Sequence, residues 1–295
     1  MARERVQSEA MVELVGSTAI VTGGAQGIGY DVARHLMAAG ANVLLLDVNG
    51  AGAEKAAETL AREQPNRRAV PLAGDVTDEG AWRSAFDLAA EELGPVTILV
   101  NNALFNRLNP ILRLGVDEWR RILDVIATGT FLGTREFGRR YVDHGLEEGV
   151  VVNVSTLNFM VPATGLAGYC SAKAALSMFT QVAALEYAPM GIRVNAIAPA
   201  LTDTALARAF FGSSPAVPQA FIANTPLGRI GETADQAKVV VFLASRAAAW
   251  ITGITLVCDG GMHLVGVPDN WSLMKGPLGM EDPTPQEWAR GVQSS

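Results

Sequence analysis

The chain has 295 residues, of which 49% are hydrophobic and 18% are charged, and its formal net charge at pH 7 is −7. The apolar content excludes disorder for the bulk of the chain, and the negative charge argues against a nucleic acid or an anionic membrane as partner. No run approaches the roughly 18 consecutive apolar residues of a membrane-spanning helix. Two cysteines cannot form a disulfide framework, so we expect a cytoplasmic protein. The scattered histidines show no metal-ligand spacing, and no metal site is expected.

Short apolar runs alternate along the chain with longer, alanine-rich segments. The runs do not alternate in polarity, which is typical of strands buried on both faces of a parallel sheet. Repeated β–α alternation predicts a doubly wound α/β fold with right-handed crossovers. The predicted strands cover residues 18–22, 42–47, 69–73, 97–100, 150–154, 193–198 and 254–258. The predicted helices cover residues 28–39, 52–63, 78–93, 116–143 and 168–188.

Two segments depart from this alternation. Residues 200–228 mix glycine, proline and serine with apolar side chains, which indicates a mobile flap over a pocket. The stretch after Gly261 has no clear period. We therefore expect an N-terminal extension (1–15), a single domain (16–261) that includes the flap, and a C-terminal tail (262–295). The tail docks either on the body of the chain or on another subunit.

The sequence TGGAQGIG (22–29) lies between a predicted strand and a predicted helix. Glycines at this spacing let the backbone turn sharply and approach a pyrophosphate at the helix N-terminus. A merely structural glycine turn is the alternative, because the spacing alone is a weak signal. Asp47 ends the next predicted strand, where a carboxylate can accept hydrogen bonds from both ribose hydroxyls of an adenosine. The carboxylate also repels a 2′-phosphate, and Gln26 supplies no positive charge, so both residues favour NAD over NADP.

Tyr169 and Lys173 lie four residues apart, on one face of a predicted helix. A free tyrosine, with a pKa near 10, is a poor acid or base at neutral pH. One ammonium about 4 Å away, at an effective dielectric constant of about 20, contributes about 4 kcal/mol, which is enough to bring the pKa to about 7. The pair therefore predicts an acid–base group, with a solvated pair on a helix surface as the alternative.

These motifs resemble, in the same order, those of the short-chain dehydrogenase/reductase family. The resemblance runs from about residue 16 to residue 261. It implies a seven-stranded, doubly wound parallel Rossmann sheet in a single domain, and a homodimer or homotetramer formed through the helices at about 116–141 and 168–188. The motifs that carry it are TGGAQGIG (22–29), Asp47, Asp75-Val76, NNA (101–103), VNVST (152–156), YCSAK (169–173), RVNAIAP (193–199) and CDGG (258–261).

The resemblance also implies roles for individual residues. Tyr169 is similar to the family's catalytic acid/base, and Lys173 to the residue that holds the nicotinamide ribose and lowers the tyrosine pKa. Thr156 stands where the family has a serine that polarises the substrate oxygen, and the threonine hydroxyl can donate in the same way. The implied cofactor-binding residues are Gly23, Gln26, Gly27, Ile28, Gly29, Asp47, Asp75, Val76, Asn102, Ala103, Tyr169, Lys173, Pro199 and Thr204.

Besides Thr156, three positions depart from the family pattern. Leu104 follows NNA, and Ala200 follows Pro199, where the family has glycines. Ile126 stands where the family has an asparagine that holds a water between the lysine and solvent. Isoleucine cannot hold that water, so the proton relay must run differently, slowly or not at all. A non-redox enzyme (isomerase, dehydratase or cyclase) and a nucleotide-binding protein without turnover are therefore alternative readings.

The side chains expected around the substrate are apolar and aromatic. For each of them, ordinary core packing is the alternative. We expect an NAD(H)-dependent oxidoreductase that interconverts a secondary alcohol and a ketone on a bulky, apolar small molecule. The candidate substrate residues are Leu104, Phe105, Phe159, Met160, Val161, Leu201, Phe210, Phe211 and Phe221.

Overall fold

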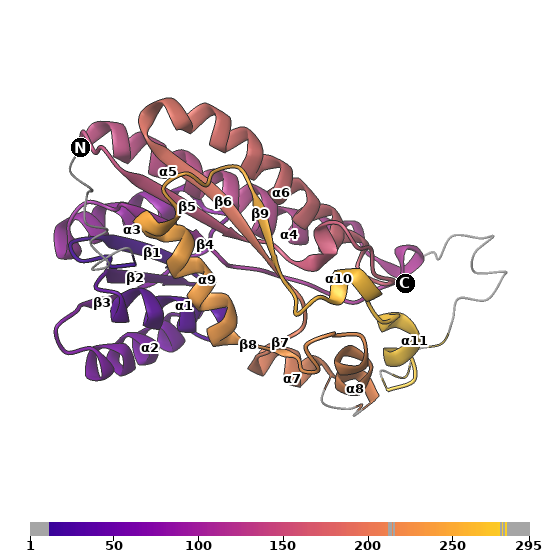
Figure 1. The fold of residues 1–295 in the computed structure, drawn as a ribbon. Coiled ribbons are helices and arrows are strands. Elements are labelled where there is room, and N and C mark those ends of the chain that lie inside the picture. The colour runs from indigo at the N-terminus through magenta and orange to yellow at the C-terminus, as the bar shows by residue number, and fades with distance from the viewer. Residues whose placement is uncertain (1–11, 212–213, 215, 278, 280, 282–295) are drawn as a thin grey trace, which may run out of the picture.

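The computed structural model describes residues 12–211, 214, 216–277, 279 and 281. Seven parallel strands form one sheet in the order β3-β2-β1-β4-β5-β6-β9, with helices on both faces (Figure 1). The fold is therefore the single α/β domain with a doubly wound parallel sheet that the sequence predicts. The strands are β1 (Thr18–Thr22), β2 (Asn42–Asp47), β3 (Ala69–Ala73), β4 (Ile98–Asn101), β5 (Gly149–Val154), β6 (Ile192–Pro199) and β9 (Thr255–Cys258).

Every residue of β1, β4 and β5 is buried, because helices cover both faces at the centre of the sheet. Strand β1 pairs with β2 on one side and with β4 on the other. The chain order of the strands thus reverses between β1 and β4. In open α/β sheets a ligand binds at such a reversal, beyond the carboxyl ends of the strands.

Two groups of helices bury the two faces of the sheet (Figure 1). Their apolar side chains form separate core clusters with the strands, one on each side. One face carries α1 (Gly27–Ala38), α2 (Gly50–Glu63) and α9 (Thr233–Ala244). The other carries α3 (Glu79–Leu93), α4 (Val116–Leu123), α5 (Gly129–Asp143) and α6 (Ala167–Tyr187). Short 3₁₀ turns lie at Ile111–Arg113, Leu157–Phe159, Ala188–Met190 and Arg246–Ala248.

The helix expected over residues 116–143 is interrupted. A π-helical turn, Asp124–Thr128, separates α4 from α5. Here the N–H of Gly129 donates to the carbonyl of Asp124, and the Thr130 hydroxyl donates to the carbonyl of Ile126 at 2.7 Å. Gly129 lies so close to Val76 that a Cβ would approach the valine Cγ2 to 2.9 Å. A turn with i→i+5 hydrogen bonds rotates the side chains that follow it around the helix axis. The periodicity of the sequence did not predict this turn.

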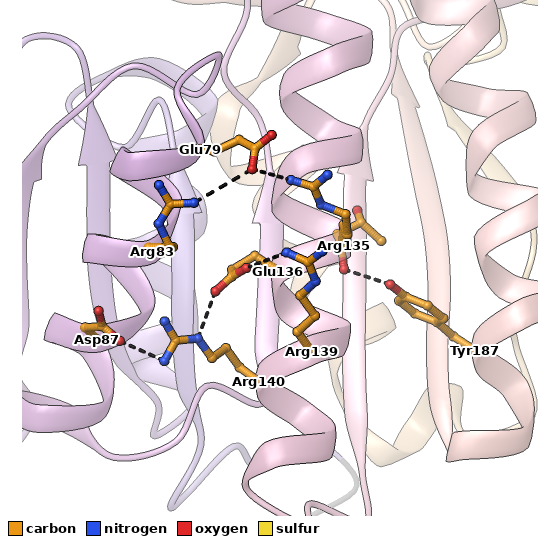
Figure 2. Close-up of polar contacts among 9 residues, drawn as sticks. Glu79, Arg83, Asp87, Arg135, Glu136, Arg139, Arg140 and Tyr187 are labelled. Atoms are coloured by element: carbon orange, nitrogen blue, oxygen red, sulfur yellow. Dashed lines mark hydrogen bonds and ion pairs between the residues drawn. The ribbon is translucent and has the colours of Figure 1, made fainter.

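Helices α3 and α5 meet through a buried contact and a set of ion pairs (Figure 2). A Cβ on Gly133 would lie 2.4 Å from the ring of Trp82, so only glycine fits there. On the outer side of this contact, Arg135 pairs with Glu79 at 2.9 Å, and Arg140 bridges Glu136 at 2.8 Å and Asp87 at 2.7 Å. Tyr187 of α6 donates to the carbonyl of Thr134 at 3.0 Å. These contacts fasten the two long helices to the body of the domain.

The expected flap is only partly irregular. It contains β7 (Thr202–Asp203), α7 (Ala205–Phe211) and α8 (Ala216–Ala223), and β7 pairs with β8 (Gly231–Glu232). After β9 the chain forms α10 (Met262–Val265) and α11 (Asn270–Met274), beside α8 (Figure 1). The described part of the tail thus packs on the body of its own chain. No helix in the described part of the chain has both the length and the apolar character needed to cross a bilayer.

Candidate active site

A cavity of about 680 Å³ opens at the carboxyl ends of the central strands, where the strand order reverses. The residues around it come from the loops after β1, β2, β3, β4, β5 and β6, from the flap and from the tail. Most of the residues expected to bind a cofactor line this cavity. These are Gly23, Gln26, Gly27, Ile28, Asp47, Asp75, Val76, Asn102, Ala103, Tyr169, Pro199 and Thr204.

The glycine-rich loop brings the N-terminus of α1 to the cavity. Gly23 and Gly27 have φ angles of 64° and 59°, which glycine adopts without strain. Gly29 lies behind the loop, and a Cβ there would come within 2.2 Å of the carbonyl oxygen of Gly23. No side chain caps α1 and its first turn carries no acidic residue. Its first N–H groups are therefore free to bind an anion such as a pyrophosphate.

Asp47 lies at the end of β2 and already makes two hydrogen bonds. One carboxylate oxygen accepts from the backbone N–H of Ala25 at 3.0 Å, and the other from that of Asn49 at 2.9 Å. The carboxylate thus ties the glycine loop to β2. Each oxygen keeps a further lone pair for a ligand, so the structural role and the expected cofactor role are compatible.

Asp75 is engaged by a neighbouring arginine that the sequence analysis did not single out. Arg121 of α4 donates to it at 2.8 Å, and the N–H of Thr77 donates at 2.9 Å. Burial acts to raise the pKa of Asp75, but these hydrogen bonds outweigh it and hold the pKa below its usual value.

Asn102 supports the glycine-rich loop. Its side-chain amide donates to the carbonyls of Thr22 and Gly23 and fixes the first turn of that loop.

Tyr169 and Thr156 both line the cavity. Thr156 follows β5 and Tyr169 lies in the first turn of α6, and the two side chains are close enough for Thr156 to affect the pKa of the phenol. Burial raises the pKa of Tyr169 to about 12, and the contact with Thr156 offsets only part of this effect. The phenol is therefore fully protonated at neutral pH and can act as a proton donor.

Lys173 lies behind the cavity wall, with 1% of its surface exposed. Its ammonium nitrogen is 5.8 Å from the centre of the Tyr169 ring and donates to the carbonyl of Val154. Burial lowers the pKa of Lys173 to about 7. We expected the lysine to lower the tyrosine pKa. In this structure that effect does not dominate, because the ammonium is directed to a backbone carbonyl and burial outweighs its charge.

Ile126 is fully buried, in the π-helical turn between α4 and α5. It belongs to a small apolar cluster with Ile122, Ala172 and Leu176, and Tyr169 packs against this cluster. The resemblance to the family places a water-holding asparagine at this position. Here the position is part of the apolar core. Its carbonyl oxygen is occupied by the hydroxyl of Thr130.

The substrate end of the cavity is mostly apolar. Of the expected substrate residues, Leu104, Phe105, Leu201 and Phe221 line it. The structure places Phe159, Met160 and Val161 outside the cavity wall, and the side chains of Phe210 and Phe211 lie outside the described residues. Several lining residues were not foreseen, since they come from loops, from the aperiodic tail and from helices whose cavity-facing side the sequence does not mark. They are Asn106, Arg121, Val125, Leu157, Asn158, Leu166, Leu206, Met262 and Val267.

Comparisons with known proteins agree with this geometry. A family model described as enoyl-(acyl carrier protein) reductase matches residues 23–263. The chain is 37% identical over 257 residues to 3beta-hydroxysteroid dehydrogenase 1 of Eggerthella lenta, a match that covers 85% of this chain and 95% of that protein. It is 36% identical to a 3-alpha-(or 20-beta)-hydroxysteroid dehydrogenase of Mycobacterium bovis, with 84% of this chain and 90% of that protein covered.

Solved structures match as well. The 3-ketoacyl-(acyl-carrier-protein) reductase from Brucella melitensis, solved in complex with NADH, superposes with a TM-score of 0.77 and 31% identity, covering 85% of this chain and 99% of that one. A short-chain type dehydrogenase/reductase from Mycobacterium marinum superposes with a TM-score of 0.80 and 30% identity, covering 85% and 97%. The matches thus extend over nearly the whole length of these proteins.

Proposed function

The chain belongs to the short-chain dehydrogenase/reductase family, and from that premise we propose that it is an NAD(H)-dependent oxidoreductase that interconverts a secondary alcohol and a ketone on a bulky, apolar small molecule. Membership establishes an enzyme that acts on hydroxyl or keto groups with a nicotinamide cofactor. The choice of NAD, the apolar substrate and the roles of individual residues are the proposal.

One observation carries this proposal: Tyr169 and Thr156 line the same cavity as a set of apolar side chains. A substrate oxygen placed against both hydroxyls meets two donors, while the remainder of the molecule meets Leu104, Phe105 and Phe221. Apolar side chains favour a ligand by removing apolar surface from water. Two relatives named as hydroxysteroid dehydrogenases act on substrates of this character.

The residues around the other end of the cavity fit a dinucleotide. The uncapped N-terminus of α1 suits its pyrophosphate, and the glycines of the loop leave room for the close approach. Asp47 suits the adenosine ribose, and Pro199 and Thr204, which line the same cavity, would hold the nicotinamide carboxamide. A carboxylate at position 47 repels an additional phosphate on that ribose, which favours NAD over NADP.

When bound, the nicotinamide supplies a hydride to the carbonyl carbon or accepts one from the carbinol carbon. Tyr169 gives its proton to the substrate oxygen in reduction and takes it back in oxidation. Thr156 donates a hydrogen bond to the same oxygen and stabilises the negative charge that develops there. General acid–base help of this kind contributes about 10²–10⁴ in rate. Lys173, when protonated, stabilises the phenolate left on Tyr169, and the resemblance to the family assigns it the nicotinamide ribose.

The loss of NADH absorbance with a panel of lipophilic ketones tests this function, with NADPH in parallel. We expect turnover with NADH and little with NADPH. Asp47→Ala should weaken NADH binding by about tenfold or more, since it removes the ribose acceptor, without a matching loss for NADPH. If the protein bound NADH tightly but turned over none of the ketones, the redox function would be contradicted. That result would favour a non-redox enzyme or a nucleotide-binding protein without turnover. Faster turnover of small polar sugars would contradict the apolar substrate.

A further inference from the structure

The chain beyond the family core folds over the substrate end of the cavity. The family model ends at residue 263, whereas α11 continues to Met274. Figure 1 shows α10 and α11 beside α8, at the end of the molecule that holds the flap. Met262 and Val267 line the cavity. We call residues 262–275 the C-terminal strap.

Apolar packing holds the strap in place. Met274 is fully buried and Trp271 is 6% exposed. Trp271 lies against Gly165, where a Cβ would be 3.8 Å from its ring. Met262 and Met274 belong to one apolar cluster in which the strap meets the loop after β4, the segment between β5 and α6, and helix α8. The members from those three segments are Leu108, Leu157, Leu166, Val217 and Phe221.

Contacts hold the strap on two sides. The amide of Asn224, directly after α8, donates to the carbonyl of Gly266 at 3.0 Å. On the other side, Trp271 packs against Gly165, between β5 and α6. Within the strap, Asp269 accepts from the hydroxyl of Ser272 at 2.6 Å, and its hydrogen bonds hold the pKa of Asp269 below the usual value. The strap thus connects the flap to the segment that carries Thr156.

This arrangement places a wall behind the flap. Phe221, Leu157 and Leu166 face the cavity from the segments that the strap holds, and Met262 and Val267 face it from the strap itself. A wall of fixed apolar side chains discriminates by size, because one methylene too many must displace packed atoms. Flaps over active sites otherwise open at low cost.

We propose that the C-terminal strap determines the size of the substrate. Met262 and Val267 are specificity-determining residues that form the wall behind the apolar body of the substrate. Trp271 and Met274 are positioning residues that keep α8 over the cavity. The size limit rests on the proposed function, since it concerns an alcohol or ketone in this cavity. The restraint on α8 does not depend on the reaction.

Hydrogen–deuterium exchange of the cofactor-free protein tests the restraint. In Trp271→Ala, we expect the amides of α8 to exchange about tenfold faster or more, while those of α1 are unchanged. The milder Asn224→Ala, which removes the bond to Gly266, should move the exchange in the same direction if Trp271→Ala does not fold. Leu264→Ala is the matched control, because Leu264 belongs to the strap but is 77% exposed. If the amides of α8 exchanged at the wild-type rate in both Trp271→Ala and Asn224→Ala, the proposed restraint on α8 would be wrong.

Discrimination by size tests the wall. We compare a four-ring steroid ketone with cyclohexanone, as the ratio of their kcat/KM values and as the ratio of their Kd values with NADH present. Val267→Phe should lower the preference for the steroid by about tenfold or more, whereas Leu264→Phe should keep both ratios within about twofold. If Val267→Phe left both the kcat/KM ratio and the Kd ratio unchanged, Val267 would not form part of a wall that limits substrate size. A wild-type protein that turns over neither ketone contradicts the proposed function instead, and the Kd ratios and the exchange of α8 still decide the inference.

Discussion

Burial acts on Tyr169 and Lys173 in opposite directions, raising the pKa of the phenol to about 12 and lowering that of the ammonium to about 7. Both groups therefore favour their neutral forms in the protein alone, because a low-dielectric site disfavours either charge. A tyrosine in this state is a proton donor. For the oxidation direction it needs added positive charge, which a protonated Lys173 and an oxidised nicotinamide can supply.

Tyr169→Phe should remove most of the turnover while leaving NADH affinity within about twofold, since it deletes the acid but keeps the ring. The expected loss in kcat is about 10²–10⁴ or more. Steady-state kinetics and NADH fluorescence titration measure the two quantities. Tyr187→Phe is the matched control on the same helix, because its hydroxyl bonds Thr134 away from the cavity. Turnover retained in Tyr169→Phe would exclude this residue as the acid.

Lys173 should make the stability of the cofactor-free protein depend on pH. An unfolded lysine stays protonated up to a pKa of about 10.4, whereas the folded one loses its proton near 7. Between these values the unfolded state binds more protons, so the free energy of unfolding rises with pH. Urea unfolding measures this free energy. Between about pH 6 and pH 9.5 the free energy of unfolding of the wild type should rise by up to a few kcal/mol more than that of Lys173→Met. Tyr169 does not interfere there, because it titrates above this range. If the free energies of unfolding of the two proteins changed equally with pH, Lys173 would not be a neutral, buried lysine.

At the scale of elements, the contact between α3 and α5 shows how one glycine sets the approach of two helices. Gly133 faces the ring of Trp82, which is buried and cannot move aside. The ion pairs of Arg135 with Glu79 and of Arg140 with Asp87, drawn in Figure 2, join the same two helices at partly exposed positions. Exposed pairs contribute little on their own, so packing at Gly133 dominates the energy of the interface.

Gly133→Ala should lower the free energy of unfolding. The added methyl forces α5 away from Trp82, at a cost of about 1–3 kcal/mol, which exceeds the gain of about 1 kcal/mol in helix propensity. Chemical denaturation gives the difference. Gly115→Ala is the control, because a Cβ at that position meets nothing within 4 Å. Equal stability of the two variants would mean that α3 and α5 separate at no cost.

At the scale of the molecule, the outer faces of α5 and α6 carry apolar side chains that the described part of the chain leaves exposed. Phe131 is 42% exposed, Met178 59%, Val182 42% and Leu185 78%. Clusters of exposed apolar residues of this kind mark interaction surfaces. They agree with the family's assembly through its two long helices, and a homodimer or homotetramer is our prediction.

Light scattering should therefore give a mass of two or four chains. Replacing Val182 and Leu185 together by glutamate should lower the mass, because two charges would be buried without partners. Ile111→Glu changes an equally exposed residue outside these helices and should leave the mass unchanged. A wild-type mass of one chain would refute the prediction.

The sequence by itself predicted the strands, the sheet type and the order of the motifs. Strands β1, β2 and β3 were expected with their observed bounds. This success has a local cause, because a continuous apolar run signals a doubly buried strand wherever it occurs. The glycine loop, Asp47 and the Tyr169–Lys173 pair were predicted from their spacing together with the strands and helices expected around them, and most of the expected cofactor residues line one cavity.

Only the tertiary structure decided the rest. The π-helical turn at Ile126 ends at Gly129, which lies against Val76, about fifty residues away in the chain. The burial that moves the pKa of Lys173 comes from elements packed around it. Met262 and Val267 reach the cavity because an aperiodic tail packs on α8. Such features arise from contacts between distant segments, and local periodicity carries no record of those contacts.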